Sequence, residues 1–390
     1  MTIKVGSGIT PTGGDKNYKV KGRPFVRSQN VGWGELILDD VAFIDDEMHR
    51  SFDSTEIKTS DVLLNITGAS IGRSAVADSR IATGNVNQHV CIIRVKPNEL
   101  NPFLLNQYLI SEYGQRQIDS FQAGGNRQGL NFAQIRSFLI PLSQSLPEQK
   151  KISDCLSSVD ELIAAQARKV DALKTHKRGL MQQLFPREGE TQPRLRPPEF
   201  LNSPEWMVKS FGEAATFYNG KAYRQEELLE EGKYKVLRVG NFFTNNSWYY
   251  SDLELDDTKY CEEGDLLYAW SASFGPRIWR GKKTIYHYHI WKVIERQGID
   301  RRFLFIALEN ETSKIKSQSA NGLGLLHITK GTIESWESAF PRPAEQRRIA
   351  DCLTSLDDLI AAQAQGLEAL KTHKKGLMQQ LFPSQVDAAA

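Results

Sequence analysis

The 390-residue sequence lacks the features that mark secreted, membrane-spanning or metal-bound proteins. Its four cysteines lie far apart without a Cys-x-x-Cys pair, which argues against a disulfide framework and a structural zinc site. No apolar run approaches the length that crosses a bilayer, and residues 1–6 show no basic stretch followed by an apolar one. We therefore expect a cytoplasmic protein with buried thiols and no bound metal.

Motifs for binding nucleotides or a methyl donor are also missing. No Gly-x-x-x-x-Gly-Lys-Ser/Thr loop occurs, and no glycine fingerprint opens a helix after a clear strand. The formal net charge is only +2, so the molecule as a whole attracts nucleic acid weakly. We expect a protein without catalysis or a cofactor of its own, which contacts any nucleic acid through local patches.

A long repeat organises what is present. Residues 148–186 return as residues 345–383, with 28 of 39 positions identical. Each copy is rich in Ala, Leu, Gln and Lys and carries proline only at its ends, which predicts a long helix. Apolar residues recur in alternating steps of four and three, the pattern of a coiled-coil seam, at Ile152, Leu156, Val159, Ile163, Val170, Leu173, Leu180 and Leu184, and again at Ile349, Leu353, Leu356, Ile360, Leu367, Leu370, Leu377 and Leu381.

Polar residues interrupt this seam at matching places in both copies. Gln166 and Lys177 recur as Gln363 and Lys374, where polar groups reduce stability but fix register and orientation. Each helix should span roughly 55 Å at about 1.5 Å per residue. Since the order is globule, helix, globule, helix, we expect an antiparallel pair with the globules at opposite ends. A generic bundle helix remains the alternative for either copy alone.

The globules, residues 1–146 and 205–342, are weaker copies of each other. Residues 25–31 match 236–242, and residues 61–64 match 265–268. β-branched and aromatic runs at 86–95 and 285–294 indicate strands, whereas 102–118 and 300–316 indicate helices. The sequence predicts an α+β fold: two pseudo-repeated globular domains joined by two long antiparallel coiled-coil helices. A linker rich in proline and charge, 187–204, separates the first helix from the second globule.

Several segments resemble the specificity subunit of type I restriction-modification systems over almost the whole chain. They are Pro147-Glu148-Gln149 and Ala344-Glu345-Gln346, which open the helices, the twice-used Gly-Leu-Met-Gln-Gln-Leu-Phe-Pro, and, in the first globule, residues 8–11, 61–68 and 87–90. The resemblance implies target-recognition domains at 1–146 and 205–342. It also implies conserved helices at 147–186 and 343–383 that act as spacer and dock, followed by a tail, 384–390. One departure is the lead-in at 205–213, which has no counterpart before the first globule.

The resemblance also implies partners. Each domain would read one half of a bipartite site in double-stranded DNA, and the helices would hold two modification subunits. Adenine methylation would belong to those methyltransferase subunits. ATP-dependent cleavage would belong to restriction subunits, the translocase and nuclease of the assembly.

Candidate DNA-reading residues are polar side chains in turns and glycine-flanked segments. Arg pairs with guanine in the major groove, and Asn or Gln pairs with adenine, although each such residue alone is more often a turn former or phosphate contact. The set comprises Arg27, Asn30, Arg73, Asn85, Asn87, Gln88, His89, Asn126, Arg127, Gln128, Tyr223, Arg224, Arg238, Asn241, Ser273, Arg277, His287, His289 and Asn321. Basic bands on the helices, at 174–178 and 371–375, provide further cations.

Two alternatives compete with a DNA-reading subunit. The first is a non-catalytic protein-interaction scaffold with a coiled-coil spacer, which would show no preference in a selection from random DNA. The second is a nuclease, since acidic residues followed by Lys loosely imitate a metal-dependent site at Asp46, Glu56 and Lys58 and at Asp252, Asp257 and Lys259. His287 and His289 form a possible metal pair that lacks partnering ligands at convincing spacing.

Overall fold

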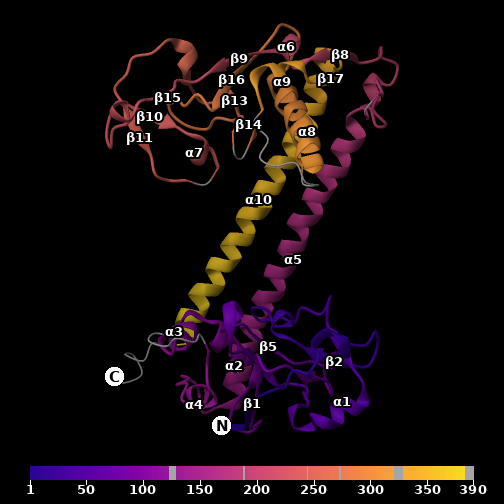
Figure 1. The fold of residues 1–390 in the computed structure, drawn as a ribbon, viewed down its shortest axis with the longest axis vertical. Helices are drawn as coiled ribbons and strands as arrows, with labels where there is room; N and C mark the ends of the chain where they lie inside the picture. The colour runs from indigo at the N-terminus through magenta and orange to yellow at the C-terminus, as the bar shows by residue number, and fades with distance from the viewer. Residues whose placement is uncertain (123–128, 188, 244, 272–273, 320–327, 383–390) are drawn as a thin grey trace. The chain divides into compact units, whose positions relative to one another are not determined.

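The computed structural model describes residues 1–390 except 123–128, 188, 244, 272–273, 320–327 and 383–390. The chain forms two compact units (Figure 1). Unit 1 comprises Met1–Arg168 and Ala364–Ala390, and unit 2 comprises Lys169–Gln363. Each unit therefore contains one globular domain and a part of both long helices.

The first domain is built on two small sheets. One is four-stranded with the order β1-β7-β4-β5, and the other is three-stranded with the order β3-β2-β6. β2 runs parallel to β6, and the other pairings in these two sheets are antiparallel. The strands are β1 (Thr2–Ser7), β2 (Arg23–Val26), β3 (Ala42–Ile44), β4 (Val62–Asn65), β5 (Ser74–Val76), β6 (Asn85–Val86) and β7 (Val90–Val95).

Short helices cover these sheets: α1 (Asp46–Ser51), α2 (Pro102–Ile110), α3 (Glu112–Ser120) and α4 (Phe132–Arg136). The single helical stretch expected over 102–118 is in fact broken at Ser111. Its backbone is extended, and its hydroxyl accepts a hydrogen bond from the Gly114 amide, so Ser111 ends α2 and caps α3. Gly114 is required there because an added Cβ would lie 2.2 Å from the Tyr108 carbonyl oxygen.

The second domain repeats this plan with the same strand order. The sheet β9-β16-β13-β14 corresponds to β1-β7-β4-β5, and β11-β10-β15-β12 corresponds to β3-β2-β6 with one strand added. The strands are β9 (Ala215–Asn219), β10 (Tyr234–Leu237), β11 (Tyr249–Ser251), β12 (Tyr260–Cys261), β13 (Leu266–Ala269), β14 (Gly275–Ile278), β15 (Thr284–Tyr286) and β16 (Ile290–Glu295). The expected α+β fold with two pseudo-repeated domains is confirmed.

The second domain also has elements of its own. The lead-in noted in the sequence forms β8 (Met207–Ser210), which pairs with β17 (Glu337–Phe340). The helices are α6 (Phe211–Ala214), α7 (Val239–Phe243), α8 (Arg301–Ser319) and α9 (Lys330–Ser335). α8 occupies the place of α2 and α3 without a break.

The two repeats form the long helices α5 (Leu146–Leu184) and α10 (Pro343–Leu381), each of 39 residues. In unit 1, Ile152 and Leu156 of α5 pack with Leu377 and Leu381 of α10. Further along α5, the Asp160 carboxylate lies 2.6 Å from the Lys374 ammonium. Residue numbers rise along one helix as they fall along its neighbour, so the pair is antiparallel, as expected (Figure 1).

In unit 2 the same arrangement recurs with the roles exchanged. Leu184 of α5 shares a core with Ile349 and Leu353 of α10, and Lys177 lies 2.7 Å from Asp357. Lys177 and Lys374 are only 14% and 13% exposed, so both seam lysines place their charges between the helices. All sixteen apolar seam residues are buried or half-buried.

Among the helices within the described ranges, none is long and apolar enough to cross a membrane.

Candidate nucleic-acid interface

One glutamine near the start of each long helix holds the adjoining domain in place. Gln149 is fully buried; its side chain accepts from the Asn101 amide at 2.8 Å and donates to the Glu99 and Ser143 carbonyls. Gln346 makes the same contacts in unit 2, with the Asp300 amide and the carbonyls of Gly298 and Pro341. The glutamine of the shared Glu-Gln motif is thus an anchor, which fixes each domain on its own helix in the same way.

Polar side chains follow the parallel strand pair of each domain, in the turns 87–89 and 287–289. β6 pairs with β2 through Val86 and Val26, and β15 pairs with β10 through Tyr286 and Leu237. Each turn then enters the central strand β7 or β16. Hence the structure places these two turns at equivalent points of the two domains, with different side chains on each.

Four of the predicted site residues stabilise two equivalent loops, which follow β2 and β10. They are Arg27 and Asn30 in the first domain and Arg238 and Asn241 in the second. The Arg27 amide donates to the Asn30 side chain at 3.0 Å, and the Arg238 amide donates to that of Asn241 at 3.4 Å. Asn30 is fully buried, and its amide group donates to the Ile37 carbonyl and the Asp40 carboxylate. The Arg238 guanidinium lies 4.2 Å from the centre of the Tyr249 ring.

Two further candidates, Asn85 and Asn87, are buried. Asn85 is inaccessible and bonds to the His49 ring at 2.8 Å and the Thr55 hydroxyl at 2.9 Å. Asn87 is 7% exposed and accepts from the His89 amide at 3.1 Å. Their amides position neighbouring segments, so a DNA contact through Asn85 would require that cluster to open.

The remaining described candidates are partly or fully accessible: Arg73, Gln88, His89, Tyr223, Arg224, Arg277, His287 and His289. Tyr223 stacks against His287, with ring centres 6.2 Å apart. Burial of the His287 ring, together with the nearby charges of His289 and Arg238, lowers the pKa of His287 to about 4. The imidazole is therefore neutral at pH 7. The other candidates, Asn126, Arg127, Gln128, Ser273 and Asn321, lie outside the described residues.

The sequence reasoning missed Tyr288, which is 38% exposed at the centre of the turn 287–289. Its ring centre lies 4.5 Å from that of His287 and 4.0 Å from that of His289, and the two histidine ring centres are 4.8 Å apart, so the three rings form one cluster. A signal was present in the sequence, since Asn-Gln-His between two β-branched runs aligns with His-Tyr-His between two others. The two histidines were weighed as possible metal ligands, and the residue between them was not among the candidates.

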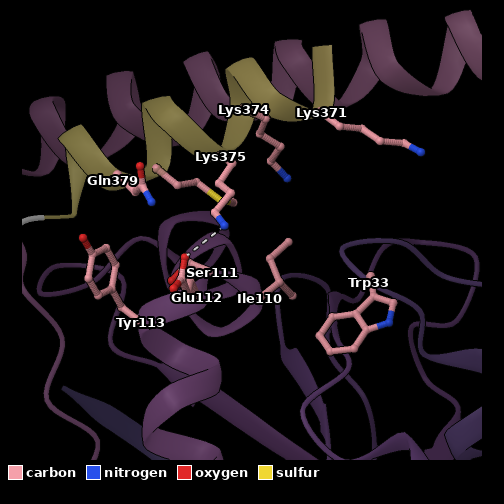
Figure 2. Close-up of a pocket in the computed structure, with 10 residues that line it drawn as sticks. Trp33, Ile110, Ser111, Glu112, Tyr113, Lys371, Lys374, Lys375 and Gln379 are labelled. Carbon is pink, nitrogen blue, oxygen red and sulfur yellow. Dashed lines mark ion pairs between the residues drawn. The ribbon is translucent and has the colours of Figure 1, made fainter. Parts of the chain in front are cut away.

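A basic hollow of about 430 Å³ lies within unit 1, between α10 and the corner where α2 meets α3 (Figure 2). α10 lines it with Lys371, Lys374 and Lys375, and the indole of Trp33 lies on the opposite side. Trp33 is 54% exposed, which is unusual for so large an apolar ring. The combination of cations and an exposed flat ring suits contact with a nucleic-acid backbone.

Not all of that charge is free. Lys374 pairs with Asp160, and Lys375 lies 3.4 Å from Glu112. Hydrogen bonding from Lys375, aided by Arg116, lowers the pKa of the Glu112 carboxyl. Lys371 is paired as well, since its ammonium lies 2.7 Å from the Glu368 carboxylate, although both side chains are largely exposed.

The acidic sets are dispersed among other partners. Arg23 lies 2.6 Å from Asp46, His49 lies 3.3 Å from Glu56, and Asp252 accepts from the Lys233 amide at 2.7 Å. Within the ranges that the structure describes, no group of three or more His, Cys, Asp or Glu side chains could hold a metal ion.

Comparison with known proteins covers both repeats. A model of the type I restriction modification DNA specificity domain matches residues 12–175 and again residues 204–372. The chain is 24% identical over 378 residues to a protein described as the type I restriction enzyme MjaX specificity subunit of Methanocaldococcus jannaschii, covering 94% of this chain and 87% of that one. It is 30% identical over 191 residues to the MjaVIII specificity subunit of the same organism, which covers 48% of this chain and 43% of the relative.

Solved structures share the fold. The S subunit of a type I restriction-modification system from M. genitalium matches with a TM-score of 0.59 and 17% identity, over 98% of this chain and 94% of that one. A chain solved in work on the assembly and conformational transition of the type I R-M system also has a TM-score of 0.59 and 17% identity, over 97% and 95% of the two chains. Because the family model matches both halves of the sequence, this chain belongs to the family of type I restriction-modification DNA specificity subunits.

Proposed function

We propose that this subunit reads a split DNA sequence with two domains and carries no catalytic group of its own. The observation that supports this is the repetition of one frame with different exposed residues. Both domains have the same strand order and the same glutamine anchor, while their equivalent turns read Asn-Gln-His and His-Tyr-His. One frame with two sets of side chains suits two half-sites of different sequence. Since cellular DNA is the ligand, the proposal places the protein in the cytoplasm.

In this proposal, partner subunits perform the chemistry. Two modification subunits methylate adenine in the recognised sequence, and restriction subunits cleave DNA with ATP. The specificity subunit alone should bind DNA weakly, because its net charge is only +2 and a large share of affinity comes from phosphate neutralisation. We expect modest, salt-sensitive binding alone, and nanomolar sequence-specific binding by the isolated chain at physiological salt would contradict this point.

The decisive experiment maps methylated adenines in DNA from cells that express the chain with its modification subunits. We expect one motif with two defined parts and a constant gap. Exchanging the globules 1–146 and 205–342 should exchange the two parts. Absence of any motif, or a motif of one continuous block, would contradict the proposal.

We further propose that helix length sets the gap. Insertion of seven residues into both α5 and α10 preserves the seam and adds about 10 Å, since each helical residue adds about 1.5 Å. At about 3.4 Å per base pair this predicts a gap longer by roughly three base pairs. As a control, substitutions of exposed residues next to the insertion points, without any insertion, should leave the gap unchanged. An unchanged gap in the insertion variant would refute the idea.

Equivalent exposed leucines on the helices are the proposed contacts for the modification subunits. Leu162 of α5 is 56% exposed and Leu359 of α10 is 41% exposed, and the repeat aligns them. Around Leu162 lies a shallow groove lined by Ser158, Ala165 and Arg168. Two copies of one partner need two matching surfaces, which these positions provide.

The test replaces Leu162 or Leu359 with Asp and measures the mass of the assembly formed with modification subunits. We expect each single variant to bind one modification subunit and the double variant to bind none. The matched control replaces Asp171 and its repeat equivalent Glu368, which are exposed and outside the groove, with Asn and Gln and should leave both subunits bound. Two bound subunits in the double variant would contradict the assignment.

A further inference from the structure

The turns 87–89 and 287–289 share the same main-chain hydrogen bonds. The first amide of each donates to the end of the parallel strand, Asn87 to the Val26 carbonyl at 3.0 Å and His287 to the Leu237 carbonyl at 2.9 Å. The Val90 and Ile290 amides close the turns onto the Asn87 and His287 carbonyls. Equivalent main-chain hydrogen bonds thus give both turns the same course.

The third residue of each turn is anchored in the same way. The His89 carbonyl accepts from the Ile66 amide, and the His289 carbonyl accepts from the Trp270 amide, both at 3.0 Å. Histidine stands at this position in both domains. A residue shared by both domains cannot account for a difference in what they read.

The first residue of each turn is also committed to the fold. The Asn87 side-chain oxygen accepts from the His89 amide at 3.1 Å, and the His287 ring nitrogen Nδ1 accepts from the His289 amide at 3.5 Å. Both are acceptors that stabilise a tight turn from within. The lowered pKa of His287 agrees with this role, because only a neutral imidazole can accept at Nδ1.

The central residue of each turn is the one that both differs and is exposed. Gln88 is exposed, and Tyr288 is 38% exposed. Gln88 carries a donor and an acceptor side by side, which matches the N6 and N7 edge of adenine in the major groove. Tyr288 offers a ring, and apolar side chains recognise thymine through its methyl group.

We propose that Gln88 and Tyr288 are equivalent specificity-determining residues. Gln88 recognises adenine in one half-site through two hydrogen bonds, and Tyr288 recognises thymine in the other half-site through contact with its methyl group. This inference rests on the proposed function, since it assigns one reader to each half of the split sequence.

The first test exchanges the two side chains in the full chain, with Gln88→Tyr and Tyr288→Gln made separately. Each variant is expressed with the modification subunits, and methylated adenines are mapped. We expect Gln88→Tyr to change one base preference in one half only, and Tyr288→Gln to change one in the other half, with the gap constant. The matched control Gln144→Tyr, at an exposed Gln outside the turns, should leave the motif unchanged.

The outcomes distinguish a failure of the proposed function from a failure of this inference. A wild-type complex without a split motif would overturn the proposed function. A split motif that is identical in wild type and both variants would overturn this inference alone.

A second test applies if the complex of a variant no longer methylates DNA. Binding of the purified complex is measured on duplexes in which single adenines become 7-deazaadenine, which lacks N7, or single thymines become deoxyuridine, which lacks the methyl group. We expect about tenfold weaker wild-type binding at one 7-deazaadenine position, and no such loss in Gln88→Ala. The smaller loss at one deoxyuridine position should vanish in Tyr288→Ala but persist in Tyr288→Phe. Equal losses in wild type and both Ala variants would overturn the proposal.

Discussion

The two domains share a strand order but pack different side chains beneath the turns 87–89 and 287–289. In the second domain, Trp291 stacks on Tyr268, with ring centres 6.0 Å apart, and Trp270 stacks on Trp291 at 5.8 Å. The corresponding positions of the first domain hold Leu64, Cys91 and Ile66, according to the strand pairings. Three aromatic rings and three smaller side chains thus support the same turn, which shows that strand order and main-chain bonds determine its course.

A second contrast lies at the start of the long helices. Glu345 is fully buried, 2.6 Å from Arg196 of the linker, and also accepts from the Trp206 indole at 3.2 Å. Glu148, its counterpart in the repeat, is exposed and bonds to Ser143. The same residue in the same helical repeat therefore has a structural role in unit 2 only, where the linker reaches it.

The largest expected effect tests this contrast. Glu345→Ala leaves the buried Arg196 guanidinium without its partner, which should reduce the free energy of unfolding by about 3–5 kcal/mol. Glu148→Ala, at an exposed site, should cost less than about 1 kcal/mol. Urea denaturation of the two variants measures the difference, and equal losses would show that the buried pair has no special role.

The next largest effect is expected at the two glutamine anchors, Gln149 and Gln346, which should contribute equally to stability. Gln149→Ala and Gln346→Ala each remove three hydrogen bonds, from one backbone amide and to two carbonyls that are mostly part-buried, so each should cost about 2–4 kcal/mol. Gln182→Ala and Gln379→Ala, at exposed equivalent positions, are the controls and should change stability little. If the two anchor variants differed by more than about 2 kcal/mol, the domains would not be fixed equivalently.

One pH effect on stability should arise from His287 in the second domain. Because the pKa of His287 is lowered to about 4, the unfolded chain binds a proton near pH 6.5 that the folded protein does not. The contribution of His287 to stability is therefore complete above about pH 6.5 and is lost as the pH falls towards 4. His287→Asn keeps a turn acceptor but cannot titrate, so the variant should lack this part of the pH dependence. Identical pH profiles of unfolding for wild type and variant would contradict the assignment.

The smallest effect concerns the seam. Lys177 and Lys374 are nearly buried, but their partners Asp357 and Asp160 are 44% and 39% exposed, so solvent weakens each pair. Lys177→Met and Lys374→Met should each change stability by about 1 kcal/mol or less. A double-mutant cycle for Lys374 and Asp160 should give a coupling of about 0.5–1 kcal/mol. A coupling near zero would show that the pair contributes no net attraction.

The sequence predicted the regular parts of the fold well. The repeat placed both long helices within two residues of their observed starts and ends, because their apolar spacing and terminal prolines are local signals. The break at Ser111 was missed. The stretch 102–118 is apolar enough to read as one helix, and the break depends on contacts between Gly114 and the preceding turn.

The candidate site stays a prediction, and residue type did not reveal which of its polar side chains are accessible. Asn30 and Asn85 suit adenine as well as Gln88 does, yet both are inside the fold. Their burial follows from hydrogen bonds to Asp40 and Thr55, which lie 10 and 30 residues away from them in the chain. Tyr288 becomes a candidate once the turns 87–89 and 287–289 are aligned, which the flanking β-branched runs suggest and the strand pairings establish.

Both turns are held by main-chain bonds and by their first side chain rather than by their central one, and this has an evolutionary consequence. A restriction system gains when its target changes faster than invading DNA can lose it. Mutations at codons 88 and 288 would alter the address in one half without requiring compensating changes in the scaffold. A chain with these turns can therefore change its target by point mutation.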